Sequence, residues 1–559
     1  MPRLLPTLIV FAVSVAMACV QSDTIERAVC ARGGRLARRG PRGPLPSFVL
    51  LLACCALAAL PAPALAQPRG PRLLVLFDDA ASGKRTHASL LDALWRRGYE
   101  ADVRSASDPT LALRDALGEW AYDHVALLAP SASSLGGDKE ARRAAWAKRA
   151  EDQGGAAAAP SSPPPAPQLS DLARLVEQGR GNVLMAVAPE SPEPLRALAL
   201  DLGVELDERG ARVFDHFARP DGGADGAWGE GEGDGGGEGP AVLARADGAG
   251  AAAAAFFGEG RLGGKPVLYR GGAAVVPASS AGTAAVVLSA SPAAYTHKPG
   301  GAPGVVAALA SPPDPTACPT GAAAALAVAV RARNNARVAV VGSLYALSDS
   351  AFAAKGFKDA ATGEAVAATG NAEFAVALAR WAFADRAVLV LENPRHRILA
   401  GSTGSEEHGV DRRLDPELLR INDDVEFAVD VWELEGAGSG REGERRPYAP
   451  PRDAPLQLSF TMLDPHVRLP LSPLGPAGGN GTLALRFRVP DVYGVFKFTL
   501  DHARPALSRL ELSRECPVRP LRHDEYERFL LPAYPYYASA LSATVALFLV
   551  VVAVLYTKE

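Results

Sequence analysis

The chain has 559 residues, a net charge of -4 and an isoelectric point near 6.2. This slightly acidic balance argues against a nucleic-acid partner, which would need a basic surface. Four of the six cysteines lie in the first 66 residues, so only Cys318 and Cys516 remain, too few for a cysteine-ligated metal site. These two either form a disulfide in an oxidising compartment or stay as thiols, and their spacing does not decide between the two.

Residues 1–66 have the features of a leader. They contain two apolar stretches, 4–20 and 48–66, separated by a basic segment. The second stretch ends in the small-residue sequence Ala64-Leu-Ala66, which predicts signal-peptide cleavage after Ala66. The first stretch is unusual upstream of a signal peptide, and it fits an upstream start codon or an incorrect gene model. A retained anchor of two spans is the alternative.

Strand and helix signals alternate in the next part of the chain. Buried strands are predicted at 72–77, 99–103, 124–130 and 183–188, and helices at 86–97 and 169–178. Asp108-Pro109 predicts a further helix, with Asp108 as N-cap and Pro109 at the first helical position. The β-α-β-α order predicts a doubly wound, flavodoxin-like parallel sheet in an α/β domain over residues 67–386.

Low-complexity insertions interrupt this domain at about 139–168 and 221–260. The first is rich in Arg, Ala and Pro and the second in Gly, Glu, Asp and Ala, so we expect surface loops or disorder. Short strands are predicted at 265–270, 273–276 and 283–288, and a polar turn with a buried strand at 332–343. Residues 369–383 form the most strongly predicted helix, because Phe374, Leu378 and Trp381 share one face.

The apolar period changes to two from Ala387 onward. Residues 425–431, 456–460 and 483–489 alternate between apolar and polar side chains, and strands are also predicted at 492–500 and 507–512. This pattern predicts an antiparallel β-sandwich over residues 387–531, between the α/β domain and the C-terminus.

An uncharged apolar run from Ala538 to Leu555 follows. The stretch from Ala538 to Tyr556 spans roughly 28 Å as a helix, close to the thickness of one hydrocarbon core, and tyrosines flank it at both ends. We predict a transmembrane helix over 532–556 with a tail of 557–559. With the signal peptide this gives a type I protein, although the positive charges before the helix do not support that orientation on their own. Small residues, with Ser539, Ser542 and Ala543 as the candidate packing positions, would let another helix approach closely.

Few residues suggest chemistry. Asp78-Asp79 at a strand end could hold a metal or act as an acid–base pair, although acidic residues also cap helices there. Ser343 lacks the second glycine of a nucleophile elbow, and Arg395-His396-Arg397 is more simply a solvated loop than an anion site. Asn480-Gly-Thr482 is an N-glycosylation sequon, which matters if this part is lumenal. The residues alone indicate no catalytic site and no cofactor.

Several long segments of the sequence resemble one family. The closest resemblance is in segments 491–498, 518–529 and 533–539, and further segments that fit are 97–100, 108–113, 131–137, 332–338 and 369–383. The family that they resemble is the 48-kDa subunits of the oligosaccharyltransferase complex, of the yeast wheat-germ-agglutinin-binding-protein type. These segments keep the family's order across nearly all of residues 72–556, apart from the insertions. Resemblance over such a length is far more specific than any one motif.

The resemblance implies a single-pass subunit in the endoplasmic reticulum membrane, with its bulk in the lumen. The complex transfers a preassembled glycan from dolichyl diphosphate to Asn in Asn-x-Ser/Thr. Members of this family are understood as non-catalytic, and the divalent metal is expected in a separate, multi-spanning catalytic subunit. That subunit, smaller membrane subunits and the bilayer are the implied partners. Only Lys558 remains of the lysine-rich tail that relatives often carry, so retention would depend on assembly.

Two readings from other classes remain as alternatives. A lumenal enzyme in its own right would use the α/β domain and Asp78-Asp79. A type I receptor or adhesion protein would use the β-sandwich, although a tail of three residues counts against signalling.

Overall fold

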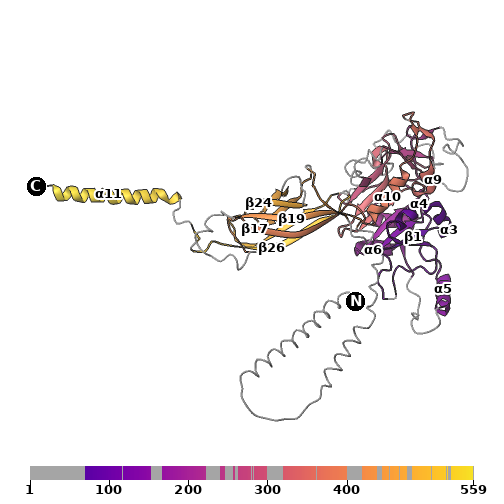
Figure 1. Ribbon diagram of the computed structural model, residues 1–559, viewed down its shortest axis with the longest axis horizontal. Coiled ribbons are helices and arrows are strands. Elements are labelled where there is room, and N and C mark those ends of the chain that lie inside the picture. Colours follow the sequence, from indigo (N-terminus) through magenta and orange to yellow (C-terminus); the bar gives the residue numbers. More distant parts are fainter. Residues whose placement is uncertain are drawn as a thin grey trace, which may run out of the picture. The chain divides into compact units, whose positions relative to one another are not determined.

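The computed structural model of the chain is shown in Figure 1. It describes residues 70–115, 117–152, 166–221, 240–245, 256–257, 262, 264–277, 280, 282–298, 319–360, 362–399, 418–436, 444–451, 454–464, 466–474, 481–504, 506–523, 525–526 and 531–557. Cleavage after Ala66, glycosylation of Asn480 and pairing of Cys318 therefore concern residues outside these ranges, and they stay predictions.

Five parallel strands form one part of the N-terminal sheet, in the order β2-β1-β3-β4-β14. They are β1 (Arg72–Phe77), β2 (Glu100–Ser105), β3 (His124–Leu128), β4 (Asn182–Ala186) and β14 (Arg337–Val341). Continuous apolar runs suit such strands, because helices cover a parallel sheet on both faces. The strands predicted at these positions are confirmed.

Antiparallel strands extend the same sheet beyond β14. β13 (Ala325–Arg331), whose residues are all buried, pairs with β14 and also with β11 (Ala284–Ser289). β10 (Ala274–Val275) pairs with β13 and with β5 (Glu205–Leu206). The sheet is therefore mixed, with its parallel strands on the side of β1.

Helices cover both faces of this sheet. Successive residues of a strand point to opposite faces, so Leu73 and Leu74 of β1 belong to different clusters of buried side chains. The cluster of Leu73 includes side chains of α4 (Ala88–Trp95) and α10 (Asn371–Ala382), and that of Leu74 includes side chains of α6 (Leu169–Glu177) and α7 (Glu193–Asp201). The predicted helix at 369–383 is confirmed, with Phe374, Leu378 and Trp381 buried.

Shorter elements complete this part of the chain. The helices are α3 (Ala80–Thr86), α5 (Lys139–Asp152) and α9 (Asp349–Ala353), and the single turns are η4 (Gly321–Ala323) and η5 (Tyr345–Leu347). The strand pairs are β6 (Arg212–Phe214) with β12 (Tyr295–His297), β8 (Val242–Ala244) with β9 (Val267–Tyr269), and β15 (Phe357–Asp359) with both β7 (Pro220–Asp221) and β16 (Ala365–Val366).

Two local predictions are wrong. Asp108-Pro109 does not start a helix, because the Asp108 carboxylate accepts hydrogen bonds from the backbone N–H and the hydroxyl of Thr110, at 2.8 and 2.7 Å, and closes a turn. The insertion at 139–168 is not all loop, because its first part is helix α5. Buried Arg142 of α5 donates to the carbonyl of Leu111 at 2.7 Å, which holds this polar helix to the rest of the chain.

The C-terminal part contains two five-stranded sheets. In the first, β17 (Val388–Ile398), β19 (Asp424–Glu435), β24 (Thr482–Arg488) and β23 (Ser472–Pro473) are neighbours in that order, and β20 (Glu444–Pro447) pairs with β19. In the second, the order is β18 (Leu419–Arg420), β26 (Leu510–Arg519), β25 (Gly494–His502), β21 (Gln457–Thr461) and β22 (His466–Pro470). Apart from the parallel pair of β18 and β26, the pairings are antiparallel.

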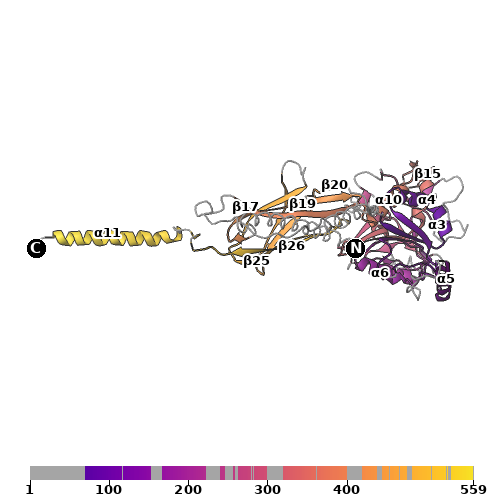
Figure 2. The ribbon, with the colours of Figure 1, turned by 60° about the horizontal axis from the view of Figure 1, so that its bottom comes forward.

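The buried faces of these two sheets contact each other. Phe427 of β19 stacks on Phe498 of β25, with ring centroids 5.0 Å apart, and Phe460 of β21 lies 5.2 Å from Phe487 of β24. Figure 2 shows β17 and β19 in one layer and β25 and β26 in the other. The period of two predicted from Ala387 onward is therefore the pattern of strands that bury one face.

Helix α11 (Tyr534–Tyr556) follows a single turn, η8 (Leu531–Ala533). The segment Leu531–Tyr556 is long and apolar enough to cross a membrane, and none of it is buried within the chain. Its length and its isolation from the cores of the sheets are consistent with a single-pass anchor.

Candidate functional site

The carboxylates at the end of β1 have local structural partners. Asp79 is the N-cap of α3, where its side chain accepts hydrogen bonds from the backbone N–H groups of Ala81 and Ser82 at 3.1 Å. Asp78 accepts from the backbone N–H of Ser131, after β3, at 3.3 Å. Burial raises the pKa of Asp78, partly offset by the hydrogen bonds from Ser131. This arrangement ties α3 and the end of β3 to β1.

The other residues singled out for chemistry are also engaged in the fold. The hydroxyl of buried Ser343 accepts the backbone N–H of Ala346 at 3.2 Å, at the start of η5. Arg395 pairs with Asp430 at 2.9 Å, and Arg397 pairs with Glu426 on the same neighbouring strand, β19. The basic triplet is thus a strand whose two arginines are neutralised across the sheet. Within the described ranges, no group of three or more His, Cys, Asp or Glu side chains is arranged to hold a metal ion.

The polar turn at 332–338 joins three parts of the chain. Asn334 donates to the carbonyls of Val176 and Glu177, at 2.7 and 2.8 Å, at the end of α6. Asn335, in the left-handed region with φ 67°, exchanges two hydrogen bonds with the backbone of Arg509, at 2.7 and 3.0 Å. The turn therefore connects α6 to the segment that leads into β26.

Arg337, at the start of β14, is the centre of this junction. Its buried guanidinium donates to the carbonyls of Trp381, Arg386 and Ala387, at 3.0, 2.5 and 2.7 Å, and to the hydroxyl of Ser508 at 2.9 Å. It also lies 5.1 Å from the centroid of the Trp381 ring, close enough for a cation–π contact. Burial lowers its pKa to about 9, so the group remains charged at neutral pH. One side chain thus fixes the end of α10, the start of β17 and the approach to β26.

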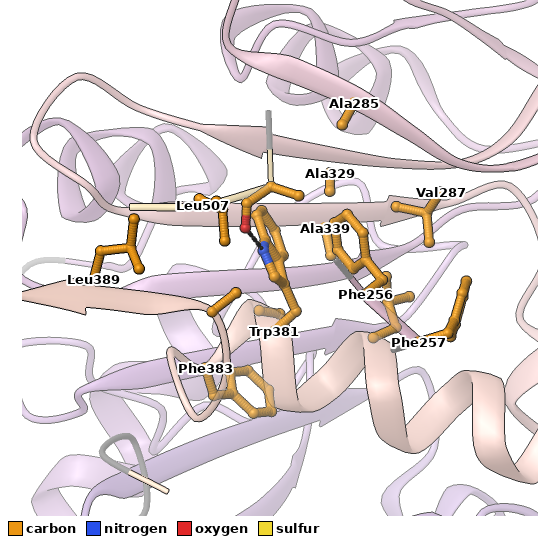
Figure 3. Packing of buried hydrophobic residues seen from close by; sticks show 14 of the residues in the cluster. Phe256, Phe257, Ala285, Val287, Ala329, Ala339, Trp381, Phe383, Leu389 and Leu507 are labelled. Carbon is orange, nitrogen blue, oxygen red and sulfur yellow. Dashed lines mark hydrogen bonds between the residues drawn. The ribbon is translucent and has the colours of Figure 1, made fainter. Parts of the chain in front are cut away.

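Apolar side chains surround the same junction. Figure 3 shows the indole of Trp381 beside Phe256 and close to Leu507, with its N–H on the carbonyl oxygen of Ala506 (dashed line), at 2.6 Å. Trp381 and Phe383 are completely buried. The N-terminal sheet, α10 and the segment before β26 therefore share one core around Trp381.

A second set of charged groups lies beside this core. Arg380 of α10 binds Asp385 and Glu435 of β19, both at 2.9 Å, and these contacts raise the pKa of Arg380 against the effect of burial. Arg97 lies 3.9 Å from the same Asp385. Tyr99 packs 5.7 Å from Phe383, and burial raises the pKa of its hydroxyl. Segment 97–100, which resembles the family, is therefore also part of the junction.

The segment between β26 and the membrane helix is anchored by ion pairs. Glu525 accepts two hydrogen bonds from Arg519 of β26, at 2.6 and 2.7 Å, and one from the backbone N–H of Arg522 at 2.8 Å. Arg420 of β18 lies 3.7 Å away. The hydrogen bond from Arg519 is the largest cause of a pKa of about 2 for Glu525, opposed by burial. Part of segment 518–529 is thus held against the second C-terminal sheet.

The candidate packing positions of α11 lie within the helix. Ser539 donates to the carbonyl of Tyr536 and Ser542 to that of Ser539, both at 2.9 Å, so their hydroxyls are satisfied inside the helix. Ser539, Ser542 and Ala543 are all exposed within the chain. Cys516 is buried on β26.

Sequence reasoning missed the roles of Arg337, Arg380 and Glu525. A signal was present for Arg337, because an arginine directly before the apolar run Val338–Val341 is costly to bury without partners. Its acceptors come from segments 44 to 171 residues away along the chain, so no local pattern identifies them.

Comparisons with known proteins agree with this picture. Two family models match, the N-terminal domain of OST48 over residues 165–385 and the OST48 middle domain over residues 405–558. The 48 kDa subunit of dolichyl-diphosphooligosaccharide–protein glycosyltransferase from Arabidopsis thaliana is 30% identical over 493 residues, 88% of this chain and 94% of that protein. The proteins of that name from Caenorhabditis elegans and Danio rerio are 30% and 29% identical, over 88% and 87% of this chain and 93% and 92% of their own lengths. The chain therefore belongs to the family of the 48 kDa subunits of this glycosyltransferase, the oligosaccharyltransferase complex.

Proposed function

We propose that this chain is a non-catalytic subunit that stabilises the oligosaccharyltransferase complex, which N-glycosylates nascent proteins. Family membership over most of the chain supports the role in the complex. The candidate catalytic side chains support the non-catalytic part, because Asp79 caps a helix, Asp78 holds a loop and Ser343 starts a turn. The divalent metal and the reacting groups then belong to a separate, multi-spanning subunit, and this chain takes no cofactor.

The proposal depends mainly on the contacts that join the N-terminal sheet to the C-terminal sheets, because a subunit that stabilises a complex must hold its own parts in a fixed arrangement. Arg337, Asn335 and Arg380 connect the N-terminal sheet to the two C-terminal sheets, and Glu525 holds the segment after β26 against the second of these sheets. Such a connection would hold the whole extramembrane part at a defined place beside its partner subunits. Those partners include the catalytic subunit and small membrane subunits.

The finer architecture and topology form part of the proposal. The strand order β2-β1-β3-β4-β14 with helices on both faces supports a flavodoxin-like domain over 67–386, and the contacting sheets support a β-sandwich over 387–531. We place both in the lumen of the endoplasmic reticulum, with a signal peptide at 1–66, one span at 532–556 and a cytosolic tail of 557–559.

The test is purification of the tagged full chain in a gentle detergent. Mass spectrometry would identify co-purifying proteins, and the eluate would be assayed for transfer of a lipid-linked oligosaccharide to a peptide with Asn-x-Thr. We expect a multi-spanning glycosyltransferase in the eluate and transfer activity. Recovery of the chain alone and without activity would contradict the assignment.

One variant distinguishes the proposed subunit role from the alternative that this chain is itself a catalytic enzyme. Asp78→Asn keeps the size of the side chain and an oxygen acceptor for the N–H of Ser131. We expect the transfer activity of the purified complex to stay the same. Loss of activity with normal assembly and thermal stability would favour a catalytic role for Asp78.

A further inference from the structure

Four large apolar side chains are exposed at one end of the second C-terminal sheet. Leu463 is 97% exposed, Tyr493 66%, Val495 56% and Val492 38%. We call these residues the apolar tip. Exposed apolar side chains are ordinary when they are single, but a cluster of them indicates a surface that is covered in use.

The register of the strands brings the apolar tip together. β21 pairs with β25 up to Thr461 opposite Lys497, and Leu463 and Val495 each lie two residues beyond this last pair, at the same end of the two neighbouring strands. A Cβ on Gly494 would lie 2.5 Å from the sulfur of Met462, which shows how closely the two segments approach there. The apolar tip therefore gathers residues where β21 ends and where β25 begins, at one end of two neighbouring strands.

This patch lies at the end of the sheet from which the chain leaves for the membrane. Gly494 pairs with Val518, and Arg519, the next residue, holds Glu525 by two hydrogen bonds. From Glu525 to Leu531, where the apolar segment begins, the chain has six residues, which span at most about 20 Å when fully extended. The apolar tip is thus tethered close to the level at which the anchor enters the bilayer.

The chemistry of this end suits a lipid interface. Tyrosine is enriched where apolar chains meet headgroups, because its ring and its hydroxyl prefer different surroundings. Tyr526, 59% exposed, and the tyrosines at the start of α11 continue the same composition along the chain. Exposed Arg522 and His523 come just before Tyr526 along the chain, and cationic side chains such as that of Arg522 are attracted by anionic headgroups.

We propose that the apolar tip inserts into the interfacial layer of the leaflet at which α11 begins, and that it gives the C-terminal sheets a second attachment to the bilayer. The proposal depends on the membrane span alone and not on the role in glycosylation. Attachment at two points would restrain tilting of the extramembrane part relative to the membrane, which a single helix after a short connection does not do.

Site-specific photo-crosslinking tests this. Benzoylphenylalanine would replace Tyr493 in the full chain, purified and reconstituted in nanodiscs of phosphatidylcholine and phosphatidylserine, and also in microsomes. The control is the same replacement at Phe217, which is equally exposed, at 66%, but lies in the N-terminal part. After irradiation, mass spectrometry would identify the adducts. We expect lipid adducts at position 493 in both settings, at a several-fold higher yield than at 217.

Two results would overturn the proposal. One is a lipid yield at 493 no greater than at 217 in nanodiscs. The other is a protein adduct at 493 in microsomes in place of lipid, which would assign the apolar tip to a partner subunit. A second measurement places benzoylphenylalanine at Leu463 in a chain that carries Tyr493→Asp and Val495→Asp. The yield of lipid adducts at 463 should fall several-fold because of these two substitutions, while the unfolding temperature stays unchanged.

Discussion

The guanidinium of Arg337 donates to three backbone carbonyls and one hydroxyl, and it lies over the face of Trp381. Its replacement by Ala would leave those buried acceptors without a donor and open a cavity at the junction. We expect Arg337→Ala to lower the free energy of unfolding by about 2–4 kcal/mol. Arg333→Ala, on an exposed side chain four residues earlier, should have almost no effect.

Thermal unfolding of the purified full chain would measure this difference. Arg337→Lys should also be destabilising, because one ammonium cannot reach four acceptors that a planar guanidinium reaches. Equal unfolding temperatures for Arg337→Ala and Arg333→Ala would show that the junction does not depend on this residue.

Glu525 should make the stability of the chain sensitive to acid. Its pKa in the folded chain is about 2, below the usual value of 4.5, mainly because Arg519 donates to the carboxylate. The interaction therefore stabilises the fold above pH 4.5, and this contribution is lost as the pH falls from there toward 2. Glu525→Gln should be less stable than the parent chain at pH 7 and should lose less stability between pH 5 and about 3.

Unfolding curves at several pH values would show this. Glu515→Gln is the matched control, because Glu515 is exposed and its ion pair with Lys497, at 3.3 Å, lies on the surface. A parent chain and a Glu525→Gln variant with parallel pH profiles would contradict the assigned role.

At the scale of elements, α11 has small residues on one face. Ser539, Ser542 and Ala543 lie at spacings of three and four, and their exposed surfaces leave room for another helix. Ser539→Leu with Ser542→Leu should weaken recovery of the complex in gentle detergent, while the part outside the membrane stays folded. Ala540→Leu with Thr544→Leu places the same bulk on another face and should have less effect. Equal recovery of the two double variants would exclude this face as a packing surface.

The elements that the sequence predicts well are those with a local signal. The apolar runs of β1, β3, β4 and β14 and the apolar face of α10 are confirmed, because burial dictates their composition. Helix α5 was missed because its stretch is charged and Ala-rich, and what holds it is Arg142 on a distant carbonyl. The helix predicted from Asp108 was wrong because an aspartate that can cap a helix can equally close a turn.

In the whole molecule, the segments that resemble the family connect distant parts of the chain. Segment 332–338 joins α6, α10 and the residues before β26, and segment 97–100 packs beside Phe383 and Asp385. Part of segment 518–529 binds the second sheet. These contacts join residues far apart in sequence, so the local pattern of each segment could not predict them. A chain whose family-like segments make its own internal connections is consistent with the proposed assembly role.

The proposed orientation of the whole chain in the membrane can be tested at its sequon. The sequon at Asn480 lies between the proposed signal peptide and the proposed span, so the proposed lumenal location would make it available for glycosylation as the chain is translocated. Thr482 of the sequon later donates to Asp430, at 2.7 Å, which also fixes the start of β24 in the folded state. Treatment with an endoglycosidase should increase the mobility of the parent chain on a gel.

The variants separate modification from folding. Asn480→Gln should abolish the mobility shift, whereas Thr482→Ser should keep it, because the serine preserves both the sequon and a hydroxyl for Asp430. A second sequon appended after Glu559 should stay unmodified if the tail is cytosolic. Modification of the appended sequon, with Asn480 unmodified, would reverse the proposed orientation and place the sheets on the other side of the membrane.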